Sequence, residues 1–416
     1  MAKPILLIAD KNNNISDVKG FAACAMAGEN IFALEEKDLI PMPCQTKIFF
    51  LPKRRPLGFD LRQKIFREIA DYFPVAAFVP PGYTQLFTCA YKEEPGAEIL
   101  PLFSYAPLVW YKSRFHVPAI RVDQRKVHDL SLVNMADVRR NIQKFRKTSN
   151  RLIMHLRTCA LNSQCPNAIN FFLGRYECPL PSSPHCNAGC FGCISFQEKG
   201  SCVSSQERIS FMPTPEELAE IALLHIKNTR KAIVSFGQGC EGEPLLAGEV
   251  IDKAIRIIRS KTAKGTIHMN TNASLPRVVE KLCNSGLDSL RVSFNSLRKE
   301  FYNKYYRPIG YEFEDVIRSV MLAKNKGKFV SINYLTMPGF TDEVAEWQKL
   351  ERFIRKTAVD MIQWRNLNYD PQRYFQELGH KRSGPRKLLG VKTIMGRLKK
   401  EFPKLLQGYF NISNGR

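Results

Sequence analysis

The sequence predicts an α/β fold in which a partial (βα)6, TIM-like barrel stands between a small N-terminal α+β lobe and a basic C-terminal helical tail. From about residue 167, short apolar runs alternate with amphipathic helical stretches, which is typical of repeated βα units. Parallel strands joined by right-handed crossovers also curl toward a barrel, and ligands bind at the carboxyl ends of such strands. We expect a core domain over 167–370, with strands at 169–173, 232–236, 266–271, 289–294, 329–335 and 361–367.

Residues 1–150 form the expected N-terminal lobe. Strand-like runs such as ILLIA at 5–9 and KIFFL at 47–51 are separated by Pro and Gly in PPGYT and PLGFD, which indicates short strands and turns. Its three cysteines, Cys24, Cys44 and Cys89, are too far apart to form a motif, so we interpret them as free thiols. No residue pattern in the lobe indicates a chemistry.

Helices between the strands have readable starts. Thr214 is expected to cap a helix that has Pro215 at its first position and glutamates at 216 and 217, where negative charge is favourable. Further helices are expected near residues 248, 276, 312 and 341.

Residues 375–416 are expected to form a basic C-terminal helical tail. SGP at 383–385 predicts a hinge. A basic amphipathic helix follows, with one apolar face made of Val391, Ile394, Met395 and Leu398. We expect this helix to pack on the barrel or to bind a partner.

The composition indicates a globular protein of the cytoplasm. Apolar residues make up 44% of the 416 residues and are spread along the chain, so a core can form. No apolar run approaches the roughly 18 residues that span a bilayer, and PILLIAD at 4–10 is too short for a signal-peptide core. In the cytoplasm twelve cysteines are kept mainly as thiols, so a tight group of them favours metal binding or redox chemistry over disulfides.

The charge is strongly basic. Lys and Arg number 62 against 39 Asp and Glu, a net charge of +23 that attracts nucleic acid, acidic substrates or anionic lipid headgroups. Two stretches concentrate it, 139–157 and 381–404. Each is interpreted either as a solvated face or as a polyanion-binding surface.

Three cysteines form the most informative motif. HCNAGCFGC places Cys186, Cys190 and Cys193 in a Cys-x3-Cys-x2-Cys loop after the first expected strand. Iron–sulfur clusters are usually held by four thiolates, so three leave one iron open to an external ligand. A structural zinc site is the alternative, but it requires four closed ligands and usually shows paired Cys-x2-Cys knuckles.

This motif, with the aromatic residue Phe191 before its last cysteine, resembles the signature of the radical S-adenosylmethionine (SAM) superfamily. The resemblance implies an enzyme with a [4Fe–4S] cluster on these three cysteines. It implies that S-adenosylmethionine binds the open iron and is cleaved to a 5′-deoxyadenosyl radical. It also implies an electron donor such as flavodoxin or ferredoxin. The cofactors supply this chemistry, while the protein supplies position and shielding.

A second match follows the second expected strand. SFGQGCEGEPLL at 235–246 resembles the Gly-Gly-Glu-Pro segment of the superfamily, with Gly242, Glu243 and Pro244 in matching positions and Glu241 in place of the first glycine. The glycines permit close backbone approach, and Glu243 offers a carboxylate to the ammonium of the cofactor's methionine part. On its own this run could be an ordinary tight turn.

Other polar residues stand at strand ends that match superfamily positions near the cofactor's carboxylate and ribose. These are Asn272, Ser293 and Asn295, which we expect either to bind the cofactor or to act as caps and turn residues. YLTMPGF at 334–340 could contact the adenine.

Several further cysteines lie near the cluster loop. Cys159, Cys165, Cys178 and Cys202 match no ligand spacing, so packing thiols are favoured over a second cluster. Cys240 lies inside the glycine-rich segment, at the expected mouth of the active site. It is a candidate catalytic residue, as hydrogen donor or covalent participant.

The reaction and the substrate do not follow from the sequence. No cysteine occurs after Cys283, so the C-terminal auxiliary-cluster domain of peptide-modifying relatives is absent. The same absence removes the methyl-carrying cysteine of the radical ribosomal-RNA methyltransferases, although GEPLL resembles their sequence. An activating enzyme for a glycyl radical protein is a related option. From another class, the chain could be a non-catalytic iron–sulfur or zinc protein that binds nucleic acid, which the Glu243 segment disfavours.

Overall fold

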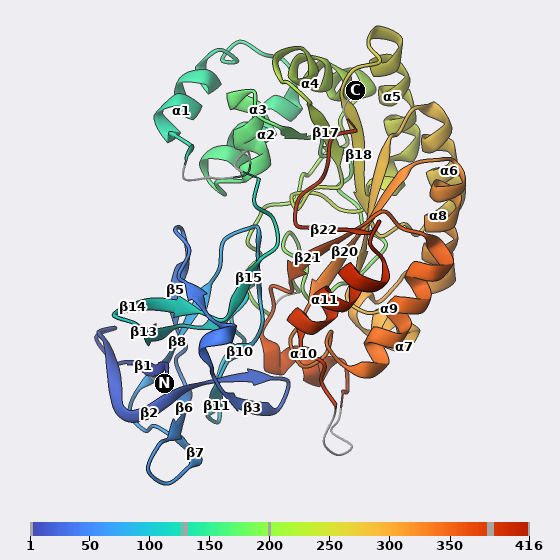
Figure 1. Cartoon of the computed structure of the whole chain (residues 1–416). Helices are drawn as coiled ribbons and strands as arrows, with labels where there is room; N and C mark the ends of the chain where they lie inside the picture. The colour runs from blue at the N-terminus through green and yellow to red at the C-terminus, as the bar shows by residue number, and fades with distance from the viewer. Residues whose placement is uncertain (1–2, 126–127, 129–131, 199–200, 381–386, 415–416) are drawn as a thin grey trace.

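The computed structural model describes residues 3–125, 128, 132–198, 201–380 and 387–414. It contains a β-rich N-terminal region and a larger region in which helices surround a parallel sheet (Figure 1). Among the described residues, no helix is both long and apolar enough to cross a membrane.

The parallel sheet forms part of a barrel. Its seven strands follow one another in chain order, and all six pairings between neighbours are parallel. The strands are β16 (Glu177–Pro179), β17 (Ile233–Phe236), β18 (Thr266–Thr271), β19 (Ser289–Phe294), β20 (Phe329–Thr336), β21 (Met361–Asn366) and β22 (Leu406–Gly408). The connecting helices lie outside the sheet (Figure 1) and are α4 (Pro215–Asn228), α5 (Gly248–Lys261), α6 (Pro276–Ser285), α8 (Phe313–Asn325) and α9 (Val344–Thr357).

The first expected strand was wrong. Residues 169–173 belong to helix α3 (Pro166–Leu173), and the sheet begins instead at β16. Short apolar runs do not distinguish a buried strand from a buried helix. Here Pro166 at the first helical position and Gly174 in the left-handed conformation at the end are the helix signals that decide it. The other five expected strands are confirmed as β17 to β21.

The expected helix starts are mostly confirmed. Thr214 Oγ1 accepts a hydrogen bond from the Glu217 amide, and the Glu217 carboxylate accepts one from the Thr214 amide, which completes a capping box. Helix α9 begins at Val344, three residues later than expected, and α7 (Lys299–Tyr306) was not expected.

The N-terminal region is built from antiparallel strands and one 3-10 turn at Glu36–Asp38. Among its described residues no α-helix precedes residue 122, so the one α-helix wholly within the expected α+β lobe over 1–150 is α1 (Met135–Gln143). The strands are β1 (Ile5–Ala9), β2 (Ile15–Ala27), β3 (Asn30–Ala33), β4 (Ile40–Pro41), β5 (Lys47–Phe50), β6 (Arg54–Asp60), β7 (Ile65–Glu68), β8 (Phe73–Phe78), β9 (Tyr83–Gln85), β10 (Thr88–Cys89), β11 (Tyr91–Glu93), β12 (Ala106–Pro107), β13 (Val109–Tyr111), β14 (Arg114–Val117) and β15 (Ala119–Arg121).

Helices α1 (Met135–Gln143) and α2 (Arg151–Leu161) pack with the barrel region. Their buried residues Val138, Ile153 and Leu156 share one apolar core with the barrel helices. Asn150 caps α2, and its side-chain amide donates to the Glu217 carbonyl of α4 at 3.0 Å. Helices α1 and α2 therefore pack with the barrel region, although α1 falls within the expected lobe over 1–150.

The described part of the tail folds onto the barrel. Helix α11 (Val391–Glu401) buries the four apolar residues predicted for its inner face, whereas the expected hinge at 383–385 lies outside the described residues. The chain then forms β22 and reaches Asn411. The Asn411 side chain donates to Glu177 of β16 at 2.7 Å and accepts from Gln363 of β21 at 2.9 Å, so it joins two distant strands.

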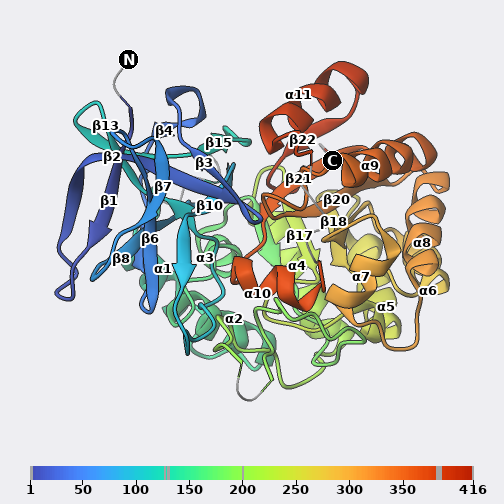
Figure 2. The same cartoon turned by 90° about the horizontal axis from the view of Figure 1, so that it is seen from below.

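The N-terminal region docks on the carboxyl ends of β20 and β21. The Gly28 amide donates to the Pro338 carbonyl at 3.1 Å, and the Thr84 hydroxyl donates to the Trp364 carbonyl at 2.9 Å. Arg54, which is 2% exposed, donates to the buried Asp370 carboxylate at 3.1 Å. Asp370 caps α10 (Pro371–Glu377), which lies between the two regions in Figure 2.

Candidate active site

The three cysteines of the predicted motif lie in one loop after β16, each partly buried. Within the described chain, one group of Cys, His or acidic side chains has all its ligand atoms within 4.8 Å of one another, and these three cysteines do not form it. A tetrahedral zinc ion with Zn–S bonds of about 2.3 Å requires sulfurs about 3.8 Å apart. Because the three sulfurs do not all lie within 4.8 Å of one another, the loop suits a cluster in which each thiolate binds a different iron better than one zinc ion.

The loop is held by the segment that follows α7. The Gly189 amide donates to the Tyr306 carbonyl at 2.8 Å, and the Ile309 amide donates to the Asn187 carbonyl at 2.9 Å. Ala188 and Pro308 form an isolated β-bridge between the same segments. The backbone between the cysteines is therefore fixed from outside the loop.

Phe191 packs into a wall of aromatic rings. Its ring centroid lies 4.6 Å from Tyr305, 5.0 Å from Tyr369 and 6.0 Å from Tyr374. A side chain at Gly192 would meet the Tyr305 hydroxyl at 2.6 Å. The aromatic residue and the glycine of the motif thus close one side of the loop against water.

Burial opposes ionisation of two of the free thiols. It raises the pKa of Cys186 to about 11 and raises the pKa of Cys190 well above its ordinary value. Such thiols lose their protons when a bound metal supplies the compensating positive charge. Cys193 accepts a hydrogen bond from the Arg208 guanidinium at 3.4 Å.

The two predicted motifs meet at the backbone. The Gly242 amide donates to the Ser183 carbonyl at 2.7 Å, and the Glu243 amide donates to the His185 carbonyl at 2.8 Å. A Cβ atom at Gly242 would lie 2.0 Å from the His185 carbonyl oxygen, so no other residue fits without moving the start of the cysteine loop. Glycine is required there by space.

Glu243 presents a desolvated carboxylate beside the cysteine loop. It accepts hydrogen bonds from the Thr271 hydroxyl, the Asn272 amide at 2.8 Å and the Leu245 amide at 3.1 Å, and Pro244 starts a short 3-10 helix after it. Burial outweighs these bonds and raises the pKa of Glu243 to about 7. A buried carboxylate of this kind is stabilised by a cationic group.

Glu241, the departure from the superfamily pattern, was given no role by the sequence and has one. Its buried carboxylate accepts from the amides of Gly237 at 2.6 Å, Gln238 at 2.8 Å and Ser182 at 2.7 Å, and also from the Ser182 hydroxyl and the Ser183 amide. It therefore ties the glycine-rich turn to the segment that leads into the cysteine loop. The sequence did carry a signal for this role, because an acidic residue stands inside a glycine-rich run.

The strand-end residues divide into two groups. Asn272 donates to the Asn187 side chain at 2.8 Å, so it lies against the cysteine loop. Asn295 instead donates to the Phe301 carbonyl and the Tyr374 hydroxyl, both at 3.3 Å, and Ser293 accepts from Asn333 at 3.4 Å. Of these three residues, only Asn272 forms a hydrogen bond with a residue of the cysteine loop.

Cys240 does not face the cysteine loop. It is 2% exposed, and its sulfur lies with Cys159 and His155 of α2, all three ligand atoms being within 4.8 Å. Its thiol donates to Cys159, which lowers the pKa of Cys159 to about 5 and raises that of Cys240. The structure thus places the Cys240 sulfur beside α2, and its catalytic role at the mouth of the active site stays a prediction.

The sequence reasoning also missed a set of polar side chains on β19, β20 and β21. Arg291 donates to Gln363 at 3.1 Å, and Arg365 lies 4.4 Å over the Tyr409 ring. Burial, together with neighbouring Arg365, lowers the pKa of Arg291 to about 9. Among the described residues, the Nε atoms of both arginines and the Asn333 Oδ1 are buried without a hydrogen-bond partner. The sequence signal for this set was the presence of polar residues at every second position of these strands, which places their side chains on one face of the sheet.

Residues 180–350 match the family model of the Radical SAM superfamily. These residues of the chain form a radical SAM domain. Enzymes of this superfamily use a [4Fe–4S] cluster and S-adenosylmethionine, which are therefore the cofactors of this radical SAM enzyme. The residues described above fit them, because a wide set of three thiols adjoins a buried carboxylate.

The curated relatives of this radical SAM chain fall into two kinds. A probable GTP 3′,8-cyclase from Methanococcus aeolicus is 30% identical over 181 residues, which cover 42% of this chain and 54% of the relative. A probable dual-specificity RNA methyltransferase RlmN from Thermotoga neapolitana is 25% identical over 204 residues, which cover 46% of this chain and 56% of the relative. The chain thus spans about half the length of the curated relatives it matches.

Solved radical SAM structures resemble this chain distantly. A radical SAM methyltransferase from Sphaerobacter thermophilus has 15% identity and a TM-score of 0.40, covering 56% of this chain and 66% of that chain. SuiB from Streptococcus suis, bound to S-adenosylmethionine, has 16% identity and a TM-score of 0.39, covering 74% of this chain and 70% of that chain.

Proposed function

We propose that Cys186, Cys190 and Cys193 hold the [4Fe–4S] cluster and that the enzyme cleaves S-adenosylmethionine reductively to a 5′-deoxyadenosyl radical. The observation that carries this proposal is the backbone contact between the cysteine loop and the Glu243 loop, which follow neighbouring strands β16 and β17. A site for metal alone has no use for a desolvated carboxylate at that point.

The side chains around the loop have distinct roles in this proposal. Glu243 binds the ammonium of the methionine part, because a buried carboxylate gains most from a cation that replaces its lost hydration. Gly242 lets that carboxylate approach the cluster loop, and Pro244 fixes the chain direction after it. Asn272 orients the loop through Asn187.

More distant residues shield the site. Phe191 and its aromatic neighbours exclude water from the cluster side. Exclusion of water protects a reactive radical from side reactions. Ser293 and Asn295 remain proposed contacts for the ribose or carboxylate, because the buried Asn295 Oδ1 has no partner in the described structure.

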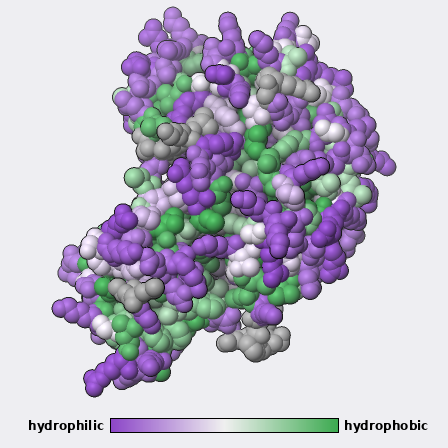
Figure 3. Space-filling model, viewed as in Figure 1, coloured by the Kyte–Doolittle hydropathy of each residue, from purple (hydrophilic) through white to green (hydrophobic). Residues whose placement is uncertain are grey.

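We infer that the substrate is anionic and bears phosphate. Arg291 and Arg365 stand on β19 and β21 with unpaired Nε atoms, and guanidinium groups recognise phosphate oxygens well. The two kinds of curated relatives are named for GTP and for RNA, both of which carry phosphate. The net charge of +23 favours such a substrate, nucleic acid included, and hydrophilic side chains predominate on the face in Figure 3.

We also propose a reducing partner and a location. A flavodoxin or ferredoxin would supply the single electron that cleavage consumes. The cytoplasm suits an enzyme whose described cysteines, twelve in number, are all free thiols.

The proposal is tested by anaerobic reconstitution with iron and sulfide, followed by electron paramagnetic resonance of the reduced protein with and without S-adenosylmethionine. We expect a [4Fe–4S]⁺ signal that changes when the cofactor is added and is absent from Cys190→Ala. Glu243→Gln should keep the iron content but bind S-adenosylmethionine about ten-fold or more weakly, because a charge-assisted hydrogen bond contributes about 1.5–3 kcal/mol.

Two results would overturn the proposal. A reconstituted cluster that never produces 5′-deoxyadenosine under strong reductant would favour a non-catalytic iron–sulfur protein that binds nucleic acid. A colourless protein that binds only zinc at the three cysteines would exclude the cluster itself.

A further inference from the structure

A second group of metal-ligand side chains lies apart from the cysteine loop. His155 and Cys159 are one turn apart on α2, and Cys240 comes from the loop after β17. The His155 Nε2 and Cys159 Sγ atoms are 3.4 Å apart, and all three ligand atoms lie within 4.8 Å of one another. Residues eighty positions apart in the chain thus bring one imidazole and two thiols to a single point.

We propose that His155, Cys159 and Cys240 bind a single zinc ion, with Cys165 as the fourth ligand. Zn–S bonds of about 2.3 Å and Zn–N bonds of about 2.0 Å set tetrahedral ligand atoms about 3.5–3.8 Å apart. The His155–Cys159 distance of 3.4 Å is close to that range, and the 4.8 Å limit on all three ligand atoms leaves only a small contraction onto one ion. A [4Fe–4S] cluster, in contrast, places each thiolate on a different iron and spreads them more widely. Three cysteines and one histidine form one of the common ligand sets of structural zinc.

Cys165 is placed to complete the tetrahedron. It is 8% exposed, and its amide donates to the Cys159 carbonyl at 3.0 Å, so the turn after α2 returns it to the group. Beside it, the Gln206 side chain lies within hydrogen-bonding reach of the Cys165 thiol. Its sulfur does not belong to the group whose ligand atoms all lie within 4.8 Å of one another, so the Cys165 thiol has to move toward the ion to complete the ligand set.

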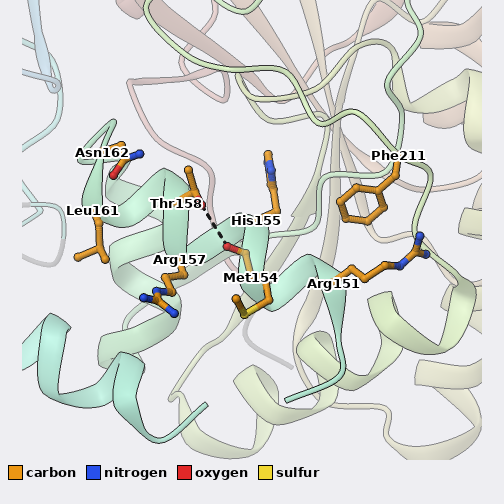
Figure 4. A pocket seen from close by; sticks show the side chains of 8 residues that line it. All are labelled: Arg151, Met154, His155, Arg157, Thr158, Leu161, Asn162 and Phe211. Atoms are coloured by element: carbon orange, nitrogen blue, oxygen red, sulfur yellow. Dashed lines mark hydrogen bonds between the residues drawn. The ribbon is translucent and has the colours of Figure 1, made fainter. Parts of the chain in front are cut away.

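The surroundings provide a path for a metal ion. His155 is half-buried and lines an open pocket of about 680 Å³, together with Arg151, Arg157 and Phe211 (Figure 4). Thiols that only pack in a core do not require an imidazole nitrogen directed at their sulfur atoms. A metal site with one histidine ligand does require it. The pocket offers the entry route that a buried site needs.

The site would have a structural role. Cys240 lies between Gly239 and Glu241, in the turn that leads to Glu243, while Cys159 belongs to a helix packed on the barrel. One zinc ion would therefore tie this turn to α2. The inference is independent of the proposed radical chemistry, because it concerns other residues and another metal.

The test removes the cluster first. The triple variant Cys186→Ala, Cys190→Ala, Cys193→Ala is purified without added metal, and its zinc and iron are measured by plasma mass spectrometry. We expect about one zinc ion per chain and no iron. Adding Cys240→Ser or His155→Ala to this background should reduce the zinc at least ten-fold. Cys283→Ser, which removes a buried thiol of α6 elsewhere in the core, is the matched control and should retain it.

A second measurement reads the ligands in folded protein. Cobalt substituted for zinc in the triple variant should give the intense thiolate charge-transfer bands and the visible bands of a tetrahedral site. These bands should be absent when Cys159→Ser is added.

Three results would overturn the inference. They are the absence of zinc and cobalt binding in the triple variant, a Cys159–Cys240 disulfide found by mass spectrometry of the freshly purified chain, and a second [4Fe–4S] cluster that depends on Cys159. Loss of radical chemistry with zinc retained would leave the inference intact, so the two proposals fail separately.

Discussion

Replacing Gly242 by alanine should disconnect the two halves of the active site. The added Cβ would lie 2.0 Å from the His185 carbonyl oxygen and 2.4 Å from its carbonyl carbon, both backbone atoms. Restoring ordinary contact requires a displacement of about 1.4 Å, because non-bonded carbon and oxygen approach to about 3.4 Å. That shift breaks the 2.8 Å hydrogen bond from Glu243 to His185 and strains the 2.7 Å bond from Gly242 to Ser183.

The expected cost follows from these two terms. Overpacking costs about 1–3 kcal/mol, and each lost hydrogen bond about 0.5–1.5 kcal/mol, so the variant should lose about 2–5 kcal/mol of unfolding free energy. Cys186 follows His185 directly, so the cluster loop should also lose its starting position. We expect a lower urea midpoint and substantially less iron per chain after anaerobic reconstitution.

Gly189→Ala is the matched control, since this glycine lies between two of the cysteines and has no positive φ. Its added Cβ would meet Arg307 at 3.5 Å, which is ordinary contact. Stability should then change by less than about 1 kcal/mol, with full iron content. If Gly242→Ala unfolded at the same urea concentration as the control and bound as much iron, the spatial argument would be refuted.

Three other perturbations have definite expected outcomes. Arg54→Leu should cost about 3–5 kcal/mol because it leaves the buried Asp370 carboxylate unpaired, and adding Asp370→Asn should restore part of that loss; additive costs in urea unfolding would contradict the pairing. Burial lowers the pKa of His225 to about 4 and of His268 to about 3, so both are neutral in the fold while the unfolded chain binds protons below about 6.5. The contribution of these two neutral histidines to the free energy of unfolding is complete above pH 6.5. It is lost as the pH falls, by about 1.4 kcal/mol per pH unit for each histidine. The urea midpoint should therefore drop between pH 7 and 5, and it should drop less in His225→Gln. RNA binding measured from 50 to 200 mM salt should weaken by about 0.9 log unit per log unit of salt for each phosphate contact, and a flat dependence would exclude a polyanion surface.

The sequence revealed those parts of the fold in which local pattern and final structure agree. β17 to β21 are apolar runs bounded by turn residues, and Thr214 with Pro215 and Glu217 carries a complete helix start. The error at 169–173 arose because an apolar run was weighed without the proline and glycine that bound it.

The candidate site could be predicted from the sequence only where the resemblance to a known family linked segments that are distant in the chain. Composition does not show that Gly242 touches His185, because that contact depends on the order of strands in the sheet. For the same reason, no rule for the spacing of metal ligands in a sequence could predict that His155 lies beside Cys240. The alternation of polar and apolar residues along their strands indicates that Arg291 and Arg365 share the polar face. It does not indicate that the two arginines lie close together.

The position of Asn411 has a consequence for synthesis. Its side chain bridges β16 and β21, and β22 pairs beside it with β21, so residues 406–411 join the first strand of the sheet to the strands at its other edge. A nascent chain that has not yet reached residue 406 holds Glu177 without this amide partner and β21 as an open sheet edge, the kind of edge that promotes aggregation.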